Sequence, residues 1–367
     1  MRRALGARAR RRGAFRHCAA SSVLVRWWLG LLFGVVFLAG CGEPLYQQES
    51  FVFGTRVEVL IHGVEADRAR AGASAVLREF DRLHRAYHAW QPSELTALNA
   101  AIARGDRSIA VSDELAMLLR EAAVLAEKSD QLFNPAIGRL VALWGFHSDE
   151  FKPAVPAEQA IAALTAAQPR MSDLTLDGAR VTSANREVAI DFGGYLKGYA
   201  LERAVSILKD HGVGNALVNI GGNIIALGAK GGQPWRVGIQ HPRASTPLAA
   251  LELRDGEAIG TSGDYQRFFE VDGQRYCHLL DPRTGRPAAG TQAVTVLIPP
   301  QQGAGVLSDA ASKPLFIAGA AQWREYARRL GVVATMHIDV AGVIRVTAAM
   351  HERIKMLDAG TSPVVEP

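Results

Sequence analysis

Apolar and polar residues follow one another along the chain in patterns that predict a mixture of helices and strands. Apolar positions three and four residues apart predict helices over residues 65–86, 112–128, 157–167, 196–211, 306–318 and 321–330. Shorter alternating or continuous apolar runs predict strands over residues 51–61, 174–176, 188–191, 216–220, 235–240, 250–253, 293–297 and 333–338. We therefore predict a single α+β domain of mixed and antiparallel sheets with flanking helices, divided into two subregions.

The first forty residues have a different pattern, which is typical of an export signal. They contain eight arginines and no acidic residue, and the apolar run Trp27–Leu38 leads into Leu-Ala-Gly followed by Cys41. This junction resembles the lipobox of bacterial lipoproteins, in which the cysteine is lipidated. The alternative is one uncleaved membrane anchor, for which the run is short. We predict a lipoprotein signal over 1–40, a lipidated tether over 41–50 and a folded domain over 51–360, anchored in the cell envelope and facing the periplasm.

Removal of this leader changes the charge of the chain. The 367 residues include 41 basic and 36 acidic side chains, and eight of the basic ones are the arginines of the leader. The remainder has 33 basic and 36 acidic side chains, a formal charge of −3. No basic patch remains that would favour nucleic acid as a partner. Apart from Cys18 and Cys41, the chain has one cysteine, Cys277, so its apolar core must stabilise it without an internal disulfide.

The block from residue 190 to residue 223 has the richest candidate chemistry. Asp191 ends an apolar run, Gly193 and Gly194 follow, and Lys197 opens an amphipathic helix. Glycines let the backbone approach a ligand, and a helix N-terminus offers N–H groups to anions. A lysine in the first helical turn opposes the helix dipole, which favours an anionic partner for it. The alternative is that Asp191 only caps the helix. The spacing matches neither a P-loop nor a Rossmann fingerprint.

Two further blocks contain polar candidates. An Asp-Gly pair at 272–273 predicts a hairpin, and Ser262, His278 and Asp281 surround it, although they do not form a nucleophile elbow. Alone, His278 is more often a structural histidine. Asp309 and Ser312 share one face of a predicted helix. Their oxygens suit a hard cation such as Mg²⁺, and the alternative is an aspartate that caps the helix.

Taken in order, these blocks resemble the ApbE family of flavin transferases, which attach FMN to proteins. The similarity runs from Phe53 to about Gly319, most of the chain beyond the leader. The segments that carry it are Phe53-Gly54-Thr55, Phe133-Asn134-Pro135, Leu143-Trp144-Gly145-Phe146, Asp191–Glu202, Asn219–Asn223, Thr261–Tyr265, His278–Gly285 and Asp309-Ala310.

The resemblance implies that FMN passes from FAD to a threonine or serine hydroxyl of an acceptor flavoprotein, such as a redox-pump subunit. AMP would be released, and Mg²⁺ would be the cofactor. The implied flavin site consists of Phe53, Trp90, Leu132, Phe133, Asn134, Asp191, Lys197 and His278. The implied metal site consists of the Gly194 carbonyl and Asp309, with the region of Ser312 and Lys313. Asp309 and His278 are the catalytic candidates, with His278 as general base because its ordinary pKa lies near working pH.

Lys313 departs from the family pattern, which has threonine four residues after the metal-binding aspartate. A protonated lysine cannot ligate Mg²⁺. Either Lys313 points away and Ser312 with backbone oxygens completes the shell, or its ammonium partly replaces the charge of the cation. We expect the first arrangement. Asn134 and Ala136 also depart from the family's Asp and Thr. Flavin transfer is the favoured function; the alternatives are an Mg²⁺-dependent FAD pyrophosphatase that gives FMN and AMP, and a non-catalytic FAD-binding lipoprotein.

Overall fold

The computed structural model describes residues 45–148, 153–358 and 360–366. The predicted leader and the candidate lipidation site Cys41 lie outside these residues. Within them, no helix combines the length and the apolar character that a membrane crossing needs.

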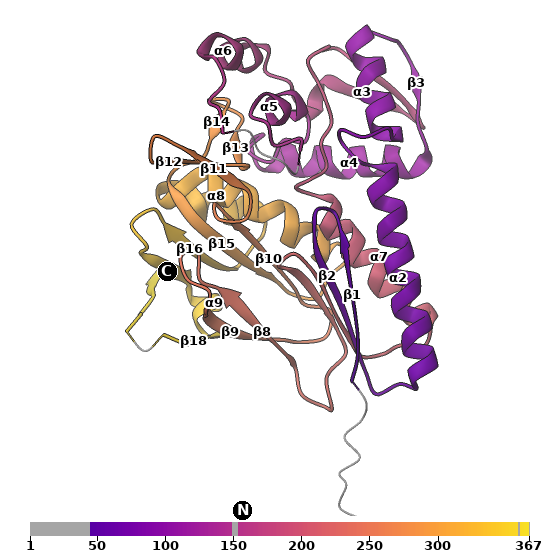
Figure 1. Ribbon diagram of the computed structural model, residues 1–367, viewed down its shortest axis with the longest axis vertical. Coiled ribbons are helices and arrows are strands. Elements are labelled where there is room, and N and C mark those ends of the chain that lie inside the picture. Colours follow the sequence, from indigo (N-terminus) through magenta and orange to yellow (C-terminus); the bar gives the residue numbers. More distant parts are fainter. Residues whose placement is uncertain (1–44, 149–152, 359, 367) are drawn as a thin grey trace, which may run out of the picture. The chain divides into compact units, whose positions relative to one another are not determined.

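A mixed sheet is the centre of the described domain (Figure 1). Its neighbouring strands are antiparallel except for β17 and β19, which are parallel. In spatial order, the nine strands found in the described residues are β1 (Leu45–Val52), β2 (Thr55–His62), β6 (Ala216–Ile220), β7 (Asn223–Leu227), β10 (Ala258–Gly263), β15 (Thr291–Ile298), β16 (Ala334–Asp339), β17 (Ile344–Thr347) and β19 (Val364–Glu366).

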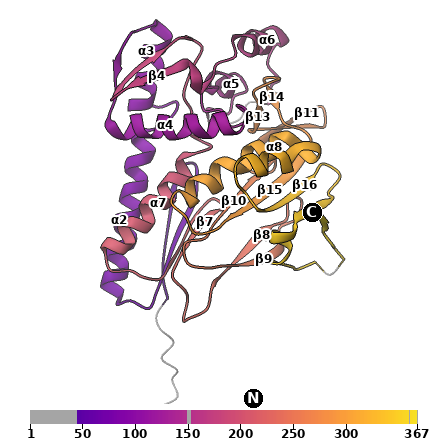
Figure 2. The ribbon, with the colours of Figure 1, turned by 180° about the vertical axis from the view of Figure 1, so that it is seen from behind.

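Different layers cover the two faces of this sheet. Helices α2 (Ala66–Ala86), α7 (Leu196–Asp210) and α8 (Ala304–Arg329) pack on one face (Figure 2). A small sheet of β8 (Trp235–Gln240), β9 (Pro247–Leu253) and β18 (Ile354–Met356), with the short helix α9 (Ala348–His351), packs on the other. Successive side chains of β15 point to opposite faces of the sheet. Val294 and Val296 pack in the core under the helices, whereas Ala293 and Leu297 pack in the core between the main sheet and the small sheet.

A second subregion consists mainly of helices and lies beside the N-terminal end of α7 (Figure 1). It contains α3 (Glu94–Arg104), α4 (Asp113–Lys128), α5 (Gly138–Leu143), α6 (Glu158–Ala167), the 3₁₀ turn η1 (Met171–Asp173) and the small sheet β3 (Ile109–Ala110), β5 (Arg180–Ser183) and β4 (Leu174–Asp177). Two hairpins adjoin it: β11 (Phe268–Val271) with β12 (Gln274–Cys277), and β13 (Leu280–Asp281) with β14 (Arg286–Pro287).

The predicted α+β architecture is confirmed, and so are several of its local features. Asp272 and Gly273 form the turn of the β11–β12 hairpin, both with positive φ, as an Asp-Gly pair predicts. Helix α8 contains the predicted interruption, because Gly319 has non-helical angles of φ 66° and ψ −174°.

Two predictions of strands were wrong. Residues 51–61 are not one strand, because the chain turns at Phe53 and Gly54, with φ 57° and 67°, and β1 pairs back on β2. The expected tether over 41–50 is therefore too long, since residues from Leu45 onward belong to the sheet. Val188 and Ile190 are buried, but instead of joining a sheet residues 188–191 run beside an irregular loop, with a single bridge from Ala189 to Ile137.

The contact between β10 and α8 gives a prediction about stability. A Cβ atom on Gly260 would overlap the Ser308 carbonyl and lie 2.9 Å from Asn223 Oδ1. We expect Gly260→Ala to lower the free energy of unfolding by about 1–3 kcal/mol or more, because α8 would have to move away from the sheet. Urea denaturation followed by tryptophan fluorescence measures this. Gly214→Ala is the matched control, since a Cβ there meets nothing within 4 Å; equal stability of the two variants would contradict the prediction.

Candidate active site

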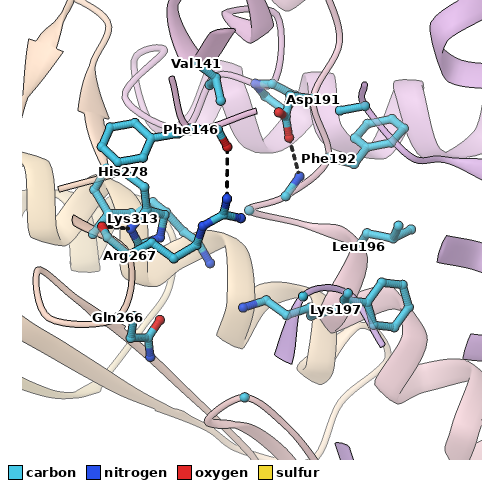
Figure 3. A pocket seen from close by; sticks show the side chains of 18 of the residues that line it. Val141, Phe146, Asp191, Phe192, Leu196, Lys197, Gln266, Arg267, His278 and Lys313 are labelled. Atoms are coloured by element: carbon cyan, nitrogen blue, oxygen red, sulfur yellow. Dashed lines mark hydrogen bonds between the residues drawn. The ribbon is translucent and has the colours of Figure 1, made fainter. Parts of the chain in front are cut away.

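A cavity of about 750 Å³ lies where the second subregion meets the main sheet and α7, a size typical of a pocket for a small-molecule ligand (Figure 3). Most of the predicted site residues line it. These residues are Phe53, Trp90, Leu132, Phe133, Asn134, Asp191, Gly194, Lys197, His278 and Lys313. Asp309 and Ser312 are fully buried and do not line the cavity.

One part of the wall is aromatic and apolar. The turn at Phe53 gives this residue an uncommon positive φ, and its ring lies 5.9 Å from that of Phe80 and 5.7 Å from that of His84. Trp90 is about one third exposed, and its ring packs edge-on against His88 at 4.9 Å. Phe133 follows helix α4 and is nearly buried. Flat rings of this kind offer stacking surfaces to a planar ligand.

Asn134 holds the loop that carries Leu132 and Phe133. Its Nδ2 donates to the Pro169 carbonyl at 2.9 Å, and its Oδ1 accepts from the Ala136 N–H at 3.0 Å. Both ends of the side-chain amide therefore have protein partners. Asn134 shapes this wall of the cavity by fixing the backbone.

The turn before α7 places Asp191 and Lys197 on the cavity. Asp191 Oδ1 accepts from the Gly193 N–H at 2.7 Å, and burial raises the pKa of this carboxyl although the hydrogen bond opposes the change. Lys197 lies in the first turn of α7 and extends toward the side of the cavity where Arg267 and His278 lie (Figure 3). Burial lowers the pKa of the Lys197 ammonium, and the nearby Asp309 carboxylate partly offsets this. An anion in the cavity would favour the charged form of Lys197.

Arg267 immediately precedes strand β11 and His278 immediately follows strand β12, so the two residues lie side by side where this hairpin begins and ends. The backbone N–H and the side-chain Nδ1 of His278 both contact the Arg267 carbonyl, at 3.0 and 3.2 Å. A carbonyl only accepts, so Nδ1 has the proton and Nε2 has the lone pair. Burial, together with the charges of Arg267 and Lys197, lowers the pKa of His278 to about 3. The imidazole is therefore neutral at pH 7 and able to accept a proton.

Behind this wall, Asp309 forms a buried ion pair with Lys313. The Lys313 ammonium contacts Asp309 Oδ1 and donates to the Asp309 carbonyl at 2.6 Å. The Gly198 N–H donates to Oδ2 at 3.0 Å, and Asn223 Nδ2 donates to Oδ1 at 3.3 Å. The expectation that Lys313 points away is wrong: the two residues are one helical turn apart on α8, which places them side by side.

Burial raises the pKa of Asp309, but the Lys313 and Lys197 ammonium groups and these hydrogen bonds outweigh burial, so the pKa lies below its usual range. Ser312 is also committed to protein partners. Its hydroxyl donates to the Asp309 carbonyl at 2.9 Å and lies 2.7 Å from the Ser262 hydroxyl.

The family model that matches the chain is that of the ApbE family, and the match covers residues 53–336. The chain belongs to the ApbE family. A relative from Rhodobacter capsulatus named FAD:protein FMN transferase is 40% identical over 340 residues, 91% of this chain and 64% of the relative. One of the same name from Treponema pallidum is 32% identical over 365 residues, 92% of this chain and 98% of the relative. The chain thus spans about two thirds of the first relative's length and nearly all of the second's.

Solved ApbE structures have the same fold. The ApbE protein of Thermotoga maritima aligns with a TM-score of 0.77 and 30% identity, over 84% of this chain and 99% of that one. The flavinyl transferase ApbE of Pseudomonas stutzeri in its apo form aligns with a TM-score of 0.71 and 27% identity, over 85% and 97%.

Arg267 was not predicted to belong to this ApbE-family site, and Asp281, one of three polar candidates, lies elsewhere. Arg267 lines the cavity, and its Nη2 donates at 3.1 Å to the carbonyls of Phe146 and Ser148. The sequence signal that could have identified Arg267 was its position between the candidates Ser262 and His278. Asp281, in contrast, does not line the cavity. Its carboxylate pairs with Arg283 at 2.8 Å and accepts from the Arg283 N–H, so it shapes the β13–β14 turn.

Proposed function

We propose that this chain transfers FMN from FAD to a serine or threonine hydroxyl of an acceptor protein and releases AMP. One observation carries the proposal: a single cavity combines aromatic surfaces with the cationic side chains Lys197, Arg267 and Lys313 and a neutral histidine. The rings suit an isoalloxazine, and the cations suit a diphosphate. Relatives named FAD:protein FMN transferase support the same reaction.

In the proposed reaction, the hydroxyl oxygen of the acceptor forms a bond to the FMN phosphorus of FAD. The bond from this phosphorus to the bridging oxygen of AMP breaks, and AMP leaves with the electron pair. The hydroxyl proton passes to His278 Nε2. Lys197 holds the diphosphate in place, and the ring-lined wall positions the flavin, so that the acceptor oxygen is in line with the leaving group.

The resemblance implied Mg²⁺, but the described residues do not fit a divalent cation. Both carboxylate oxygens of Asp309 already have donors, and one of them is the Lys313 ammonium. The Ser312 hydroxyl donates to a backbone carbonyl rather than facing the cavity. Among residues 45–148, 153–358 and 360–366, no three His, Cys, Asp or Glu side chains gather closely enough to hold a metal ion. We therefore assign no step of the reaction to Mg²⁺.

We further propose that a lipid on Cys41 anchors the chain to a membrane with the domain in the periplasm, where a flavin-carrying redox-pump subunit would be an acceptor. The basic leader, its apolar run and the Leu-Ala-Gly-Cys junction support this proposal. Metabolic labelling with a radioactive fatty acid tests it. We expect a labelled wild-type chain and an unlabelled Cys41→Ala variant, whereas label on that variant would contradict the anchor.

Incubation of the purified protein with FAD and a candidate acceptor tests the transferase function. We expect in-gel flavin fluorescence on the acceptor and an equal amount of free AMP. The matched control is the acceptor with its target threonine replaced by valine, which should stay dark. FMN and AMP without labelled acceptor would instead support an FAD pyrophosphatase, and bound but unchanged FAD would support a flavin-binding protein without this activity.

A further inference from the structure

Lys313 separates Asp309 from the cavity. Lys313 lines the cavity, with a side chain 13% exposed, whereas the Asp309 side chain is fully buried behind it. A Cβ atom placed on Gly194 would lie 3.3 Å from Lys313 Cε, so the lysine stem packs directly against this glycine. The Lys313 side chain thus packs its stem against Gly194 and places its ammonium on Asp309, and Gly194 and Asp309 are two of the residues that were expected to hold a metal ion.

The charge around this position favours an ammonium over a second cation. The Lys313 ammonium is in contact with the Asp309 carboxylate, and the Lys197 ammonium is a second positive charge near the same carboxylate. The Lys197 side chain makes no hydrogen bond or ion pair within the described part of the chain. A divalent ion beside the same carboxylate would face both ammonium groups at short range, and such repulsion is strong in a poorly solvated site.

We propose that the Lys313 ammonium acts as a built-in cation beside Asp309, so that this chain handles the FAD diphosphate without a divalent metal. The inference rests on the proposed function. While the bond between the FMN phosphorus and the bridging oxygen breaks, negative charge accumulates on the phosphate of departing AMP. Lys313 and Lys197 stabilise that charge as fixed ammonium groups held by α8 and α7, and neither forms or breaks a covalent bond. Preorganised charges of this kind need no reorganisation during the reaction.

Two variants of Lys313 separate this role from a merely structural one. Lys313→Met keeps the length of the side chain and removes its charge. Lys313→Thr removes the charge and supplies a neutral hydroxyl that can ligate a cation beside Asp309. Lys209→Thr removes the charge of an exposed lysine on α7 and is the matched control.

The first measurement needs no acceptor and no turnover. Each protein is saturated with FAD and titrated with Mn²⁺, and the free ion is followed by electron paramagnetic resonance. We expect one bound Mn²⁺ per FAD in Lys313→Thr, and no stoichiometric binding in the wild type or in Lys209→Thr. Stoichiometric Mn²⁺ binding by the FAD-loaded wild type would overturn the proposal, even if a variant failed to fold.

The second measurement is FMN transfer in EDTA and in Mg²⁺. We expect the wild type to have the same rate in both, and Lys313→Met to lose about 10²-fold or more in both because one preorganised charge is gone. Lys313→Thr should regain activity in Mg²⁺ only. A wild type that EDTA inactivates and Mg²⁺ restores would overturn the inference. Absence of transfer in every protein, with the expected Mn²⁺ pattern, would refute the proposed function and leave the built-in cation supported.

Discussion

Replacement of His278 by alanine is expected to lower the rate of FMN transfer by about 10²–10⁴-fold, the usual contribution of a general base. His278 lines the cavity, its Nδ1 proton is held by the Arg267 carbonyl, and its Nε2 is left to accept the proton of the acceptor hydroxyl. FAD binding should change little, because the aromatic wall and the cations remain. Quenching of flavin fluorescence measures binding, and labelling of the acceptor measures transfer.

His351→Ala is the matched control for this variant, since His351 is exposed at the end of α9. It should transfer FMN at the wild-type rate. A His278→Ala protein that binds FAD and labels the acceptor at the wild-type rate would remove His278 as the base. Loss of FAD binding together with transfer would instead assign His278 to the binding of the donor.

The pH dependence of the wild type gives a second measurement of the same role. In the free protein the pKa of His278 is lowered to about 3 by burial and by Arg267 and Lys197, so the base form is present from acid to neutral pH. We expect kcat/KM to stay level as pH falls through 6.5, the ordinary pKa of histidine, and to decline only near the lowered value. Bound diphosphate offsets the two cations, so the acid limb of kcat should lie at higher pH than that of kcat/KM. Acid limbs at pH 6.5 in both profiles would contradict this environment.

The parts of the site that depend on local sequence were predictable. The Gly193-Gly194 turn, the start of α7 at Leu196 and the Asp272-Gly273 hairpin all follow from rules about neighbouring residues. These local rules do not predict the turn at Phe53. A phenylalanine with positive φ contradicts its own backbone preference, and only the pairing of β1 with β2 enforces the turn. The prediction of a strand over residues 188–191 was wrong because an apolar run does not reveal whether another strand lies beside it to share hydrogen bonds.

The direction of Lys313 also depended on tertiary structure. Its spacing from Asp309 allowed contact along the helix, but an exposed helix face would have left the lysine in water. Lys313 packs against Gly194 in the turn before α7, and Asn223 donates a hydrogen bond to Asp309. Both contacts come from residues that are distant from the pair in the sequence. Arg267 was missed for a similar reason, because its partners Phe146 and Ser148 belong to the second subregion.

Replacement of Asp309 by alanine is expected to lower the free energy of unfolding by about 3–5 kcal/mol at pH 7 in the absence of FAD, the usual effect of removing one partner of a buried ion pair. The variant leaves the Lys313 ammonium without its carboxylate and the Gly198 N–H without its acceptor. FMN transfer should also be lost, because Lys313 would no longer be held in place. Urea denaturation followed by tryptophan fluorescence measures stability.

Acid should remove the same contribution from the wild type. The folded-state pKa of Asp309 lies below its ordinary value of 3.8. A carboxyl with a lowered pKa contributes stability that is fully present above the ordinary pKa and is lost as pH falls through the folded-state pKa. The stability difference between the wild type and Asp309→Ala should therefore be constant near neutral pH and shrink below about pH 4. A difference that persists unchanged in acid would mean that the carboxylate charge is not its cause.

The double variant Asp309→Ala/Lys313→Met shows whether the loss comes from the stranded ammonium. Methionine keeps the length of the lysine side chain and adapts to an apolar site, so the double variant no longer has a buried charge without a partner. We expect it to recover part of the stability that Asp309→Ala loses, while FMN transfer stays lost because the cation is absent. If the two substitutions instead lowered stability additively, they would not be coupled, and the ion pair between α8 residues Asp309 and Lys313 would not account for the effect.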